Sequence, residues 1–198
     1  MANNTLIGNT GNATSSPLDG ISAESASMCV NNIVWNPASG NELHGFSENS
    51  VWNSCVLGGT SENGNISLDP VFSASLVDTT TGAIYDAEQL RTQFSTSGFS
   101  IAAGRYVGCP IKVNGVWTVV ANNSGNTIAV WGNYATTGAV SYEILSPFIE
   151  YNSPCRNAGV LNGAPQRDWT GQLRPQELTA DIGVDEGGPY TFGITTDG

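Results

Sequence analysis

A repeated segment in the first third of the chain constrains the fold more than any other feature of the sequence. Three stretches have asparagine as their first or second residue, run through two or three apolar residues and stop at Gly, Asn or Pro: NNTLIGNTG at 3–11, VNNIVWNPASG at 30–40 and WNSCVLGGTSENG at 52–64. A spacing of about 20–25 residues is typical of one coil of a β-solenoid. In this register Ile33 matches Cys55, and Val34 matches Val56.

The same register aligns two asparagines. In a parallel stack, equivalent side chains lie about 4.8 Å apart. Asn31 and Asn53 stand just before the apolar run of their repeats, where each amide can hydrogen-bond to its neighbour along the stack. The ordinary turn propensity of asparagine explains the pattern equally well.

The composition favours strands and turns. Charged residues are only 12% of the chain and 24 residues are glycine, whereas helix surfaces need many Lys, Glu, Arg and Gln. The net charge of −11 opposes binding to nucleic acid and to anionic membranes. No apolar run approaches the ~20 residues that cross a bilayer. Met1 leads directly into polar sequence, so we expect an export signal upstream in a longer parent protein.

The middle of the chain has a different pattern. Residues 83–94, AIYDAEQLRTQF, contain good helix formers and predict one short helix. Alternating apolar segments then follow, broken at Asn114-Gly115, at 122–126 and at Gly132-Asn133, which are hairpin signals. The sequence therefore predicts terminal coils over 1–77, an inserted β-rich module of antiparallel strands over 78–146, and a last coil with C-terminal capping loops over 147–198.

The closing segment resembles a known family. SPCRNAG at 153–159, DWTGQLRP at 168–175 and DIGVDE at 181–186 follow NNIVWN, NSCVLGG and GNISLDPVF in the same order as in bacterial surface proteins of the choice-of-anchor Q group and related parallel β-helix repeat proteins. The resemblance implies an all-β fold, namely the last coils and C-terminal cap of a right-handed parallel β-helix with a small antiparallel insertion. It also implies a secreted or cell-surface location.

The four cysteines leave two interpretations open. Cys29, Cys55, Cys109 and Cys155 lack the close pairs of a zinc site or of a redox CxxC motif. Disulfides and small buried thiols are both compatible with their spacing.

The densest group of candidate metal ligands lies in the closing segment. Asp168, Asp181, Asp185 and Glu186 could hold Ca²⁺ through carboxylate oxygens. The preferred alternative is structural, because Arg174 lies between Asp168 and Asp181 and a bidentate ion pair would connect the capping loops. No other cofactor is predicted.

Catalytic signals are weak. Lys112 and His44 are the only lysine and the only histidine. Glu42 and Glu48 flank His44 and are the candidate acid pair. The simpler interpretation of His44 is an ordinary surface histidine. No G-x-S-x-G, phosphate-binding or HExxH motif is present in the sequence.

Aromatic residues offer a binding route, because indole and phenol rings stack on sugars. We expect Trp131 and Tyr134, at a predicted strand end and its turn, to be exposed and to bind a ligand. Trp117 is expected to pack inside the module, on the same face as Val119.

Two functions follow from these observations. The first is a non-catalytic extracellular module, structural or adhesive, that binds carbohydrate through the insertion and has a glycan or another surface protein as partner. The second is the C-terminal fragment of a β-helix polysaccharide lyase or glycoside hydrolase. A solenoid cut on its N-terminal side has an open coil edge, so self-association through that edge is also expected.

Overall fold

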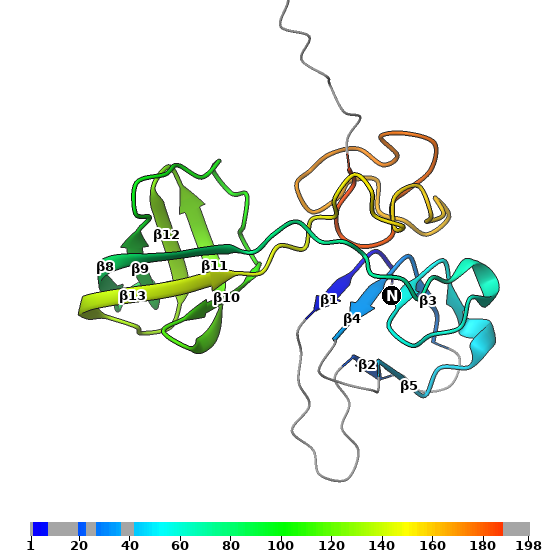
Figure 1. The fold of residues 1–198 in the computed structure, drawn as a ribbon, viewed down its shortest axis with the longest axis horizontal. Coiled ribbons are helices and arrows are strands. Elements are labelled where there is room, and N and C mark those ends of the chain that lie inside the picture. The colour runs from blue at the N-terminus through cyan, green and yellow to red at the C-terminus, as the bar shows by residue number, and fades with distance from the viewer. Residues whose placement is uncertain (1, 8–19, 23–26, 37–41, 188–198) are drawn as a thin grey trace, which may run out of the picture. The chain divides into compact units, whose positions relative to one another are not determined.

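A computed structural model describes residues 2–7, 20–22, 27–36 and 42–187 of the chain. It divides into two compact units (Figure 1). Residues 1–72 and 147–198 form the first, here called the stack unit, and residues 73–146 form the second, here called the barrel unit. The barrel unit is thus an insertion in the sequence of the stack unit.

Six antiparallel strands make up the barrel unit. They are β8 (Leu76–Asp86), β9 (Arg91–Ser95), β10 (Pro110–Val113), β11 (Val116–Ser124), β12 (Thr127–Trp131) and β13 (Thr136–Ile144). They close in the order β10-β11-β12-β9-β8-β13. Asn114 and Gly115 connect β10 to β11 with φ angles of 47° and 86°, as a two-residue hairpin turn requires.

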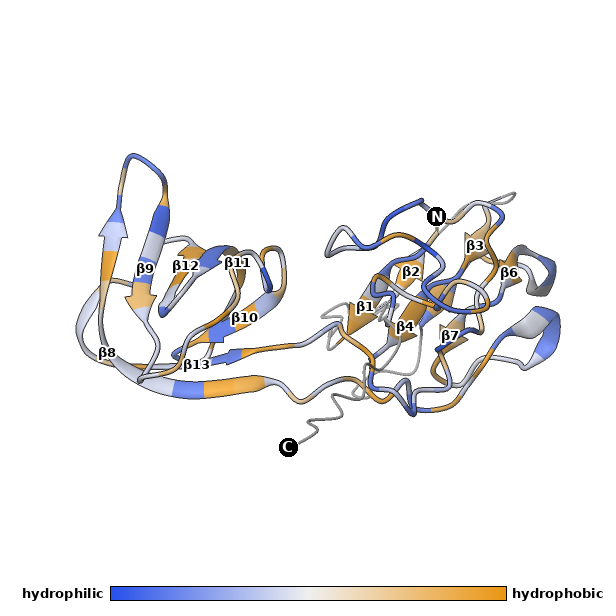
Figure 2. Cartoon of the chain, turned by 90° about the horizontal axis from the view of Figure 1, so that it is seen from above, coloured by the Kyte–Doolittle hydropathy of each residue, from blue (hydrophilic) through white to orange (hydrophobic). Residues whose placement is uncertain are grey.

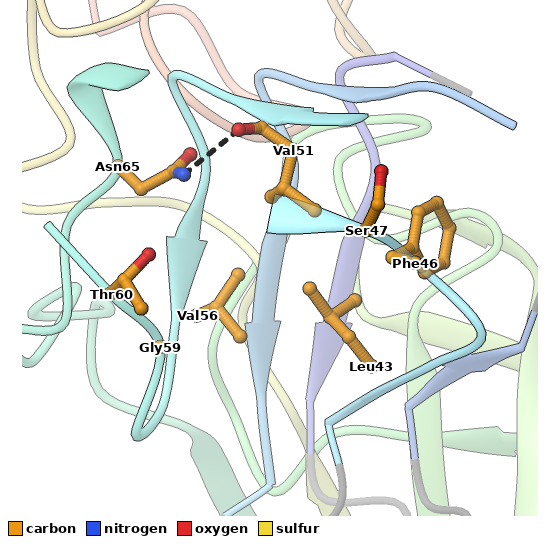
Figure 3. Close-up of a pocket in the computed structure, with 8 residues that line it drawn as sticks. All are labelled: Leu43, Phe46, Ser47, Val51, Val56, Gly59, Thr60 and Asn65. Carbon is orange, nitrogen blue, oxygen red and sulfur yellow. Dashed lines mark hydrogen bonds between the residues drawn. The ribbon is translucent and has the colours of Figure 1, made fainter. Parts of the chain in front are cut away.

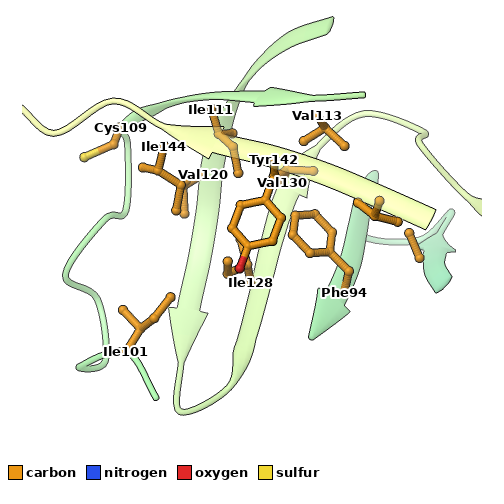
Figure 4. Packing of buried hydrophobic residues seen from close by; sticks show 12 residues of the cluster. Phe94, Ile101, Cys109, Ile111, Val113, Val120, Ile128, Val130, Tyr142 and Ile144 are labelled. Atoms are coloured by element: carbon orange, nitrogen blue, oxygen red, sulfur yellow. The ribbon is translucent and has the colours of Figure 1, made fainter. Parts of the chain in front are cut away.

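Side chains fill the inside of this barrel (Figure 4). Alternation along each strand sends every second residue inward. The buried cluster consists of Ala83, Phe94, Ile101, Cys109, Ile111, Val113, Val120, Ile128, Val130, Val140, Tyr142 and Ile144. The rings of Phe94 and Tyr142 pack with centroids 5.1 Å apart. Because the interior is occupied, a ligand can contact this unit only at its outer wall or its ends.

The short helix predicted over residues 83–94 is wrong. This stretch is the end of β8, a four-residue turn and most of β9. The Asp86 carboxylate accepts the backbone N–H groups of Glu88 and Gln89 at 2.9 and 3.1 Å, which shapes the turn. Strand pairing leaves Phe94 only 3% exposed. An isolated helix of this length is marginal, so burial in the barrel overrides the helix propensity of the turn residues.

Short parallel sheets build the stack unit. β1 (Thr5–Ile7), β4 (Ile33–Trp35) and β7 (Cys55–Val56) form one sheet, β2 (Ile21–Ser22) pairs with β5 (Leu43–His44), and β3 (Cys29–Val30) pairs with β6 (Val51–Trp52). Two 3-10 turns, η1 (Glu48–Ser50) and η2 (Glu62–Gly64), are the only helices among the described residues. Neither is long enough to cross a membrane. The chain is therefore all-β, as predicted.

The register of the first sheet agrees with the repeat. Ile33 pairs with Cys55 and Val34 with Val56, which confirms the alignment made from the sequence. The side chains of Ile33 and Val34 alternate between the two faces of the sheet, and both are fully buried. This accounts for the unbroken apolar run in the second repeat, because a strand covered on both faces has no solvent side.

A left-handed asparagine precedes each strand of this sheet. Asn3, Asn31 and Asn53 have φ angles of 53°, 53° and 44°, a conformation that asparagine tolerates better than most residues. The Asn31 amide donates to Oδ1 of Asn3 at 3.3 Å, a bond along the stack. Asn31 and Asn53 also donate to the backbone carbonyls of Val160 and Ala158, at 2.6 and 3.2 Å. These amides therefore connect the sheet to the C-terminal segment.

Two apolar clusters lie on opposite faces of the β1-β4-β7 sheet, whose strands carry the hydrophobic colour in Figure 2. One cluster consists of Ile21, Cys29, Val34 and Val51. The other, here called the tail-side cluster, consists of Ile33, Cys55, Ile149, Cys155 and Ile182. Residues 147–187 contain no regular strand. This segment packs against one face of the sheet through the tail-side cluster, and the N–H of Val184 donates to the Thr5 hydroxyl at 3.0 Å.

Candidate functional site

The outer wall of the barrel unit carries two exposed tryptophans on adjacent strands. Trp117 on β11 is 47% exposed and Trp131 at the end of β12 is 44% exposed. Val120 pairs with Val130, which places Val119 beside Trp131 on the outer face. Diagonal neighbours across an antiparallel pair lie about 7–8 Å apart, within reach of aromatic side chains. We call Trp117, Val119 and Trp131 the aromatic strip.

A basic side chain lies over each indole of the strip. The guanidinium carbon of Arg91 is 4.5 Å from the ring centroid of Trp131, and Nζ of Lys112 is 5.4 Å from that of Trp117. Strand register explains both contacts, because Arg91 pairs with Trp131 and Lys112 with Trp117. The cation–π attraction helps to orient each ring.

Charge is divided unevenly between the two units. The barrel unit contains three of the six basic residues and four of the 17 acidic residues of the chain. It is therefore close to neutral, and the stack unit accounts for nearly all of the net negative charge. The aromatic strip thus has its two cations in the unit that repels anions least.

A polar hollow shares strands β11 and β12 with the strip. Its lining residues are Gln93, Asn122, Asn123, Ser124, Thr127 and Ala129, and its volume is about 350 Å³. A β-bulge in β11 redirects the side chains here. Asn123 is used by the fold, since its amide donates to the carbonyl of Ala102 at 2.7 Å and accepts the N–H of Tyr106 at 2.8 Å. Asn122 and Gln93 are exposed and present their amides to solvent.

The structure places the predicted aromatic residues differently from the sequence. Trp131 is exposed, but Tyr134 is half-buried against the barrel core, with a ring carbon 3.0 Å from where a Cβ on Gly132 would lie. The prediction that Trp117 packs inside is wrong. Its strand points Val120 inward, at 1% exposure, so the alternate residues face outward. Alternation defines which residues share a face, and only the closed barrel decides which face is inside.

The sequence contains a signal for one of the two cations that lie over the indoles. A two-residue turn at Asn114-Gly115 pairs the residues that flank it, which brings Lys112 opposite Trp117. The partner of Trp131 is harder to find, because Arg91 lies forty residues earlier and their pairing depends on how the barrel closes.

In the stack unit, Arg174 forms a buried ion pair. It donates to Oε2 of Glu186 at 3.0 Å, and both side chains are 1% exposed. It also donates to three backbone carbonyls at 2.8–3.2 Å, those of Asp181, Gly183 and Val184. The carboxylate that pairs with Arg174 is thus Glu186, which the sequence grouped with the candidate metal ligands.

Protein donors occupy the other carboxylates of that group. Asp168 accepts the N–H groups of Gln172 and Glu186 at 2.7 and 3.2 Å. Asp181 accepts two N–H groups at 2.7 Å, and Asp185 accepts one at 3.3 Å. Burial raises the pKa values of Asp181 and Glu186. Within the described ranges, no three His, Cys, Asp or Glu side chains are grouped to hold a metal ion. The arrangement can connect loops through hydrogen bonds.

The candidate acid pair around His44 is not assembled. Glu42 is 4% exposed and accepts the N–H and the side-chain amide of Asn36 at 2.9 and 2.7 Å. His44 is exposed on β5. Glu48 belongs to η1, and its side chain lies outside the described part of the chain. Glu42 therefore holds the backbone of its own loop.

An apolar pocket of about 150 Å³ opens in the stack unit (Figure 3). Its lining is Leu43, Phe46, Ser47, Val51, Val56, Gly59, Thr60 and Asn65. One side of the pocket is formed by β7 and the loop that follows it. This loop is short, because the chain returns to pair Ile66 with Cys55, eleven residues after Cys55. The lining holds no titratable side chain, so the pocket supplies no acid–base chemistry.

Comparison of the chain with protein-family models, curated proteins and solved structures gives no match. The candidate sites are therefore distinguished by their geometry alone. Of the sites above, only the aromatic strip combines exposed rings, cations and a neighbouring hollow with free amides. That set of groups can bind a ligand that has both apolar faces and hydroxyl groups.

Proposed function

We propose that the barrel unit binds carbohydrate through the aromatic strip. The observation that carries the proposal is the presence of two half-exposed indoles on one outer wall, with a polar hollow beside them. The C–H face of a sugar ring stacks on indole, and sugar hydroxyls need donors and acceptors at its edge. Gln93 and Asn122 supply both, and Arg91 supplies further donors.

Two features of charge favour neutral glycans as the ligand. The stack unit carries nearly all of the net charge of −11, so the whole chain repels polyanions at long range although the barrel unit is close to neutral. The two cations of the strip already lie on their indoles, so they are arranged to orient rings and to donate to hydroxyls. Neutral hexose polymers are therefore the proposed substrate class, in a non-catalytic role.

Tryptophan variants test this function. Trp131→Ala and Trp117→Ala should each weaken binding to a neutral oligosaccharide, found on a glycan array, by about tenfold or more, which is about 1.4 kcal/mol or more. Trp169→Ala is the matched control, because Trp169 is 45% exposed but lies in the stack unit. Affinity is measured by isothermal titration.

Two outcomes would contradict the proposal. Equal affinity of the two strip variants and the wild type would remove the strip from the binding site. Release of reducing ends or unsaturated products from the bound glycan would show an enzyme in place of a binding module.

For the architecture, we propose that the stack unit is the terminal part of a right-handed parallel β-helix on a secreted or cell-surface protein. The support is the cyclic order of the three short parallel sheets, the confirmed register and the column of left-handed asparagines. Crossovers between parallel strands are right-handed in nearly all proteins. The barrel unit would then be displayed by the solenoid.

A further inference from the structure

Two cysteines from distant parts of the chain meet in the tail-side cluster. Cys55 on β7 and Cys155 in the closing segment are both fully buried. Each thiol lies close enough to the other to affect its ionisation, and the Cys55 thiol donates to the carbonyl of Leu68 at 3.2 Å. The backbones around them are also connected, since the Asn53 amide donates to the carbonyl of Ala158 at 3.2 Å. The contact is therefore held by the sheet and by the segment that covers it.

The other two cysteines have no such partner. Cys29 lies in the cluster on the opposite face of the sheet, where its sulfur accepts from Asn32 at 3.2 Å. Cys109 lies in the core of the barrel unit. All four cysteines are described, and only Cys55 and Cys155 share a cluster.

We propose that Cys55 and Cys155 form a disulfide bond when the protein folds in an oxidising compartment. The bond would close the chain around the barrel unit, because residues 73–146 lie wholly between the two cysteines. It would connect the parallel sheet covalently to the segment that covers its face. This inference is independent of carbohydrate binding.

The reaction needs an oxidant, for which oxidised glutathione is sufficient. One protein thiolate attacks glutathione disulfide and releases one reduced glutathione. The second thiolate attacks the protein sulfur of the mixed disulfide and releases the other. Two protein thiols become one disulfide, and one glutathione disulfide becomes two thiols.

Oxidation takes place on the folding chain. In the folded reduced protein, interaction with the Cys155 thiol and then burial raise the pKa of the Cys55 thiol, so little thiolate is present to react. The pair is therefore accessible before residues 147–187 cover the sheet. Once formed, the disulfide is protected from reductants by the same burial.

Mass spectrometry tests the pairing. The full chain is refolded in a buffer of reduced and oxidised glutathione, denatured without reductant, alkylated and digested. We expect one linked peptide pair containing Cys55 and Cys155, with alkyl groups on Cys29 and Cys109. Alkylation of all four cysteines, or a link that involves Cys29 or Cys109, would overturn the proposal.

Two variants make the test independent of peptide recovery. The double variant Cys29→Ser, Cys109→Ser should still lose both remaining thiols on refolding. In a second variant, a site-specific protease sequence is inserted at the exposed Asn114-Gly115 turn. After cleavage, the two fragments should migrate together in a denaturing gel without reductant and separate with it. Separation without reductant would refute the bond.

Discussion

Replacement of Arg174 by alanine tests the buried ion pair between Arg174 and Glu186. The change leaves the Glu186 carboxylate, 1% exposed, without the cation that pairs with it. It also removes one donor from each of three backbone carbonyls, those of Asp181, Gly183 and Val184. Loss of one partner of a buried ion pair costs about 3–5 kcal/mol. Since a domain has a total stability of about 5–15 kcal/mol, we expect Arg174→Ala to bring the stack unit close to unfolding at neutral pH.

The deficit should depend on pH. Burial raises the pKa of Glu186, and Arg174 opposes that shift. Such a group favours the folded state below its ordinary pKa of 4.5, and this contribution is lost as the pH rises through the folded value. Without Arg174 the folded pKa rises further. The free-energy difference between variant and wild type should therefore be largest at neutral pH and should shrink below the ordinary pKa.

Urea denaturation, followed by hydrogen exchange of stack-unit peptides, measures this free-energy difference at neutral pH and at a pH below 4.5. Arg167→Ala is the control, because Arg167 is exposed and donates only to the carbonyl of Gly171 at 2.6 Å, so its cost should be below about 0.5 kcal/mol. A cost for Arg174→Ala equal to that of the control would refute the reasoning. So would a deficit that is the same at both pH values.

Two further predictions concern one position in each unit. In the barrel unit, donors from Ser97 and the Tyr142 hydroxyl hold the pKa of Asp78 down, at about 2. The ionised carboxylate stabilises the fold above pH 3.8, and this contribution is lost as the pH falls toward 2. Asp78→Asn should therefore make the stability of the barrel unit less dependent on pH in acid, measured by circular dichroism, and an unchanged pH dependence would contradict the prediction. In the stack unit, Gly183 has φ of 102°, and a Cβ there would lie 2.7 Å from Cδ1 of Ile33. Gly183→Ala should therefore destabilise the stack unit by about 1–3 kcal/mol more than Gly163→Ala, because Gly163 also has a positive φ but open space around it. Equal urea midpoints for the two variants would exclude the clash.

Local patterns were sufficient for the parallel register. Each repeat has an asparagine in the left-handed conformation before its apolar run, and the runs of the second and third repeats are buried on both faces of the sheet. Both signals act within about ten residues, so they are visible without the tertiary structure. The turn at Asn114-Gly115 can be predicted from the sequence for the same reason.

Long-range packing explains what the sequence analysis missed. The turn residues between β8 and β9 are good helix formers, and they form a turn because the closed barrel buries Phe94. Trp117 was assigned to the core because period-two alternation cannot distinguish the two faces of a strand that has apolar residues on both. Arg174 was expected to bond with Asp168 or Asp181, which are nearer in sequence than Glu186, but the fold of residues 174–186 decides the partner.

The sequence by itself determined an all-β chain and the pairing of the repeats, because these depend on local conformational preference and on the period of apolar residues. Only the tertiary structure decided that the insertion closes into a filled barrel, which leaves Trp117 and Trp131 on its outer wall. It also decided that the closing segment lies against the face of the parallel sheet and brings Cys155 to Cys55. Both outcomes depend on contacts between residues far apart in the chain, whose free energy no local pattern records.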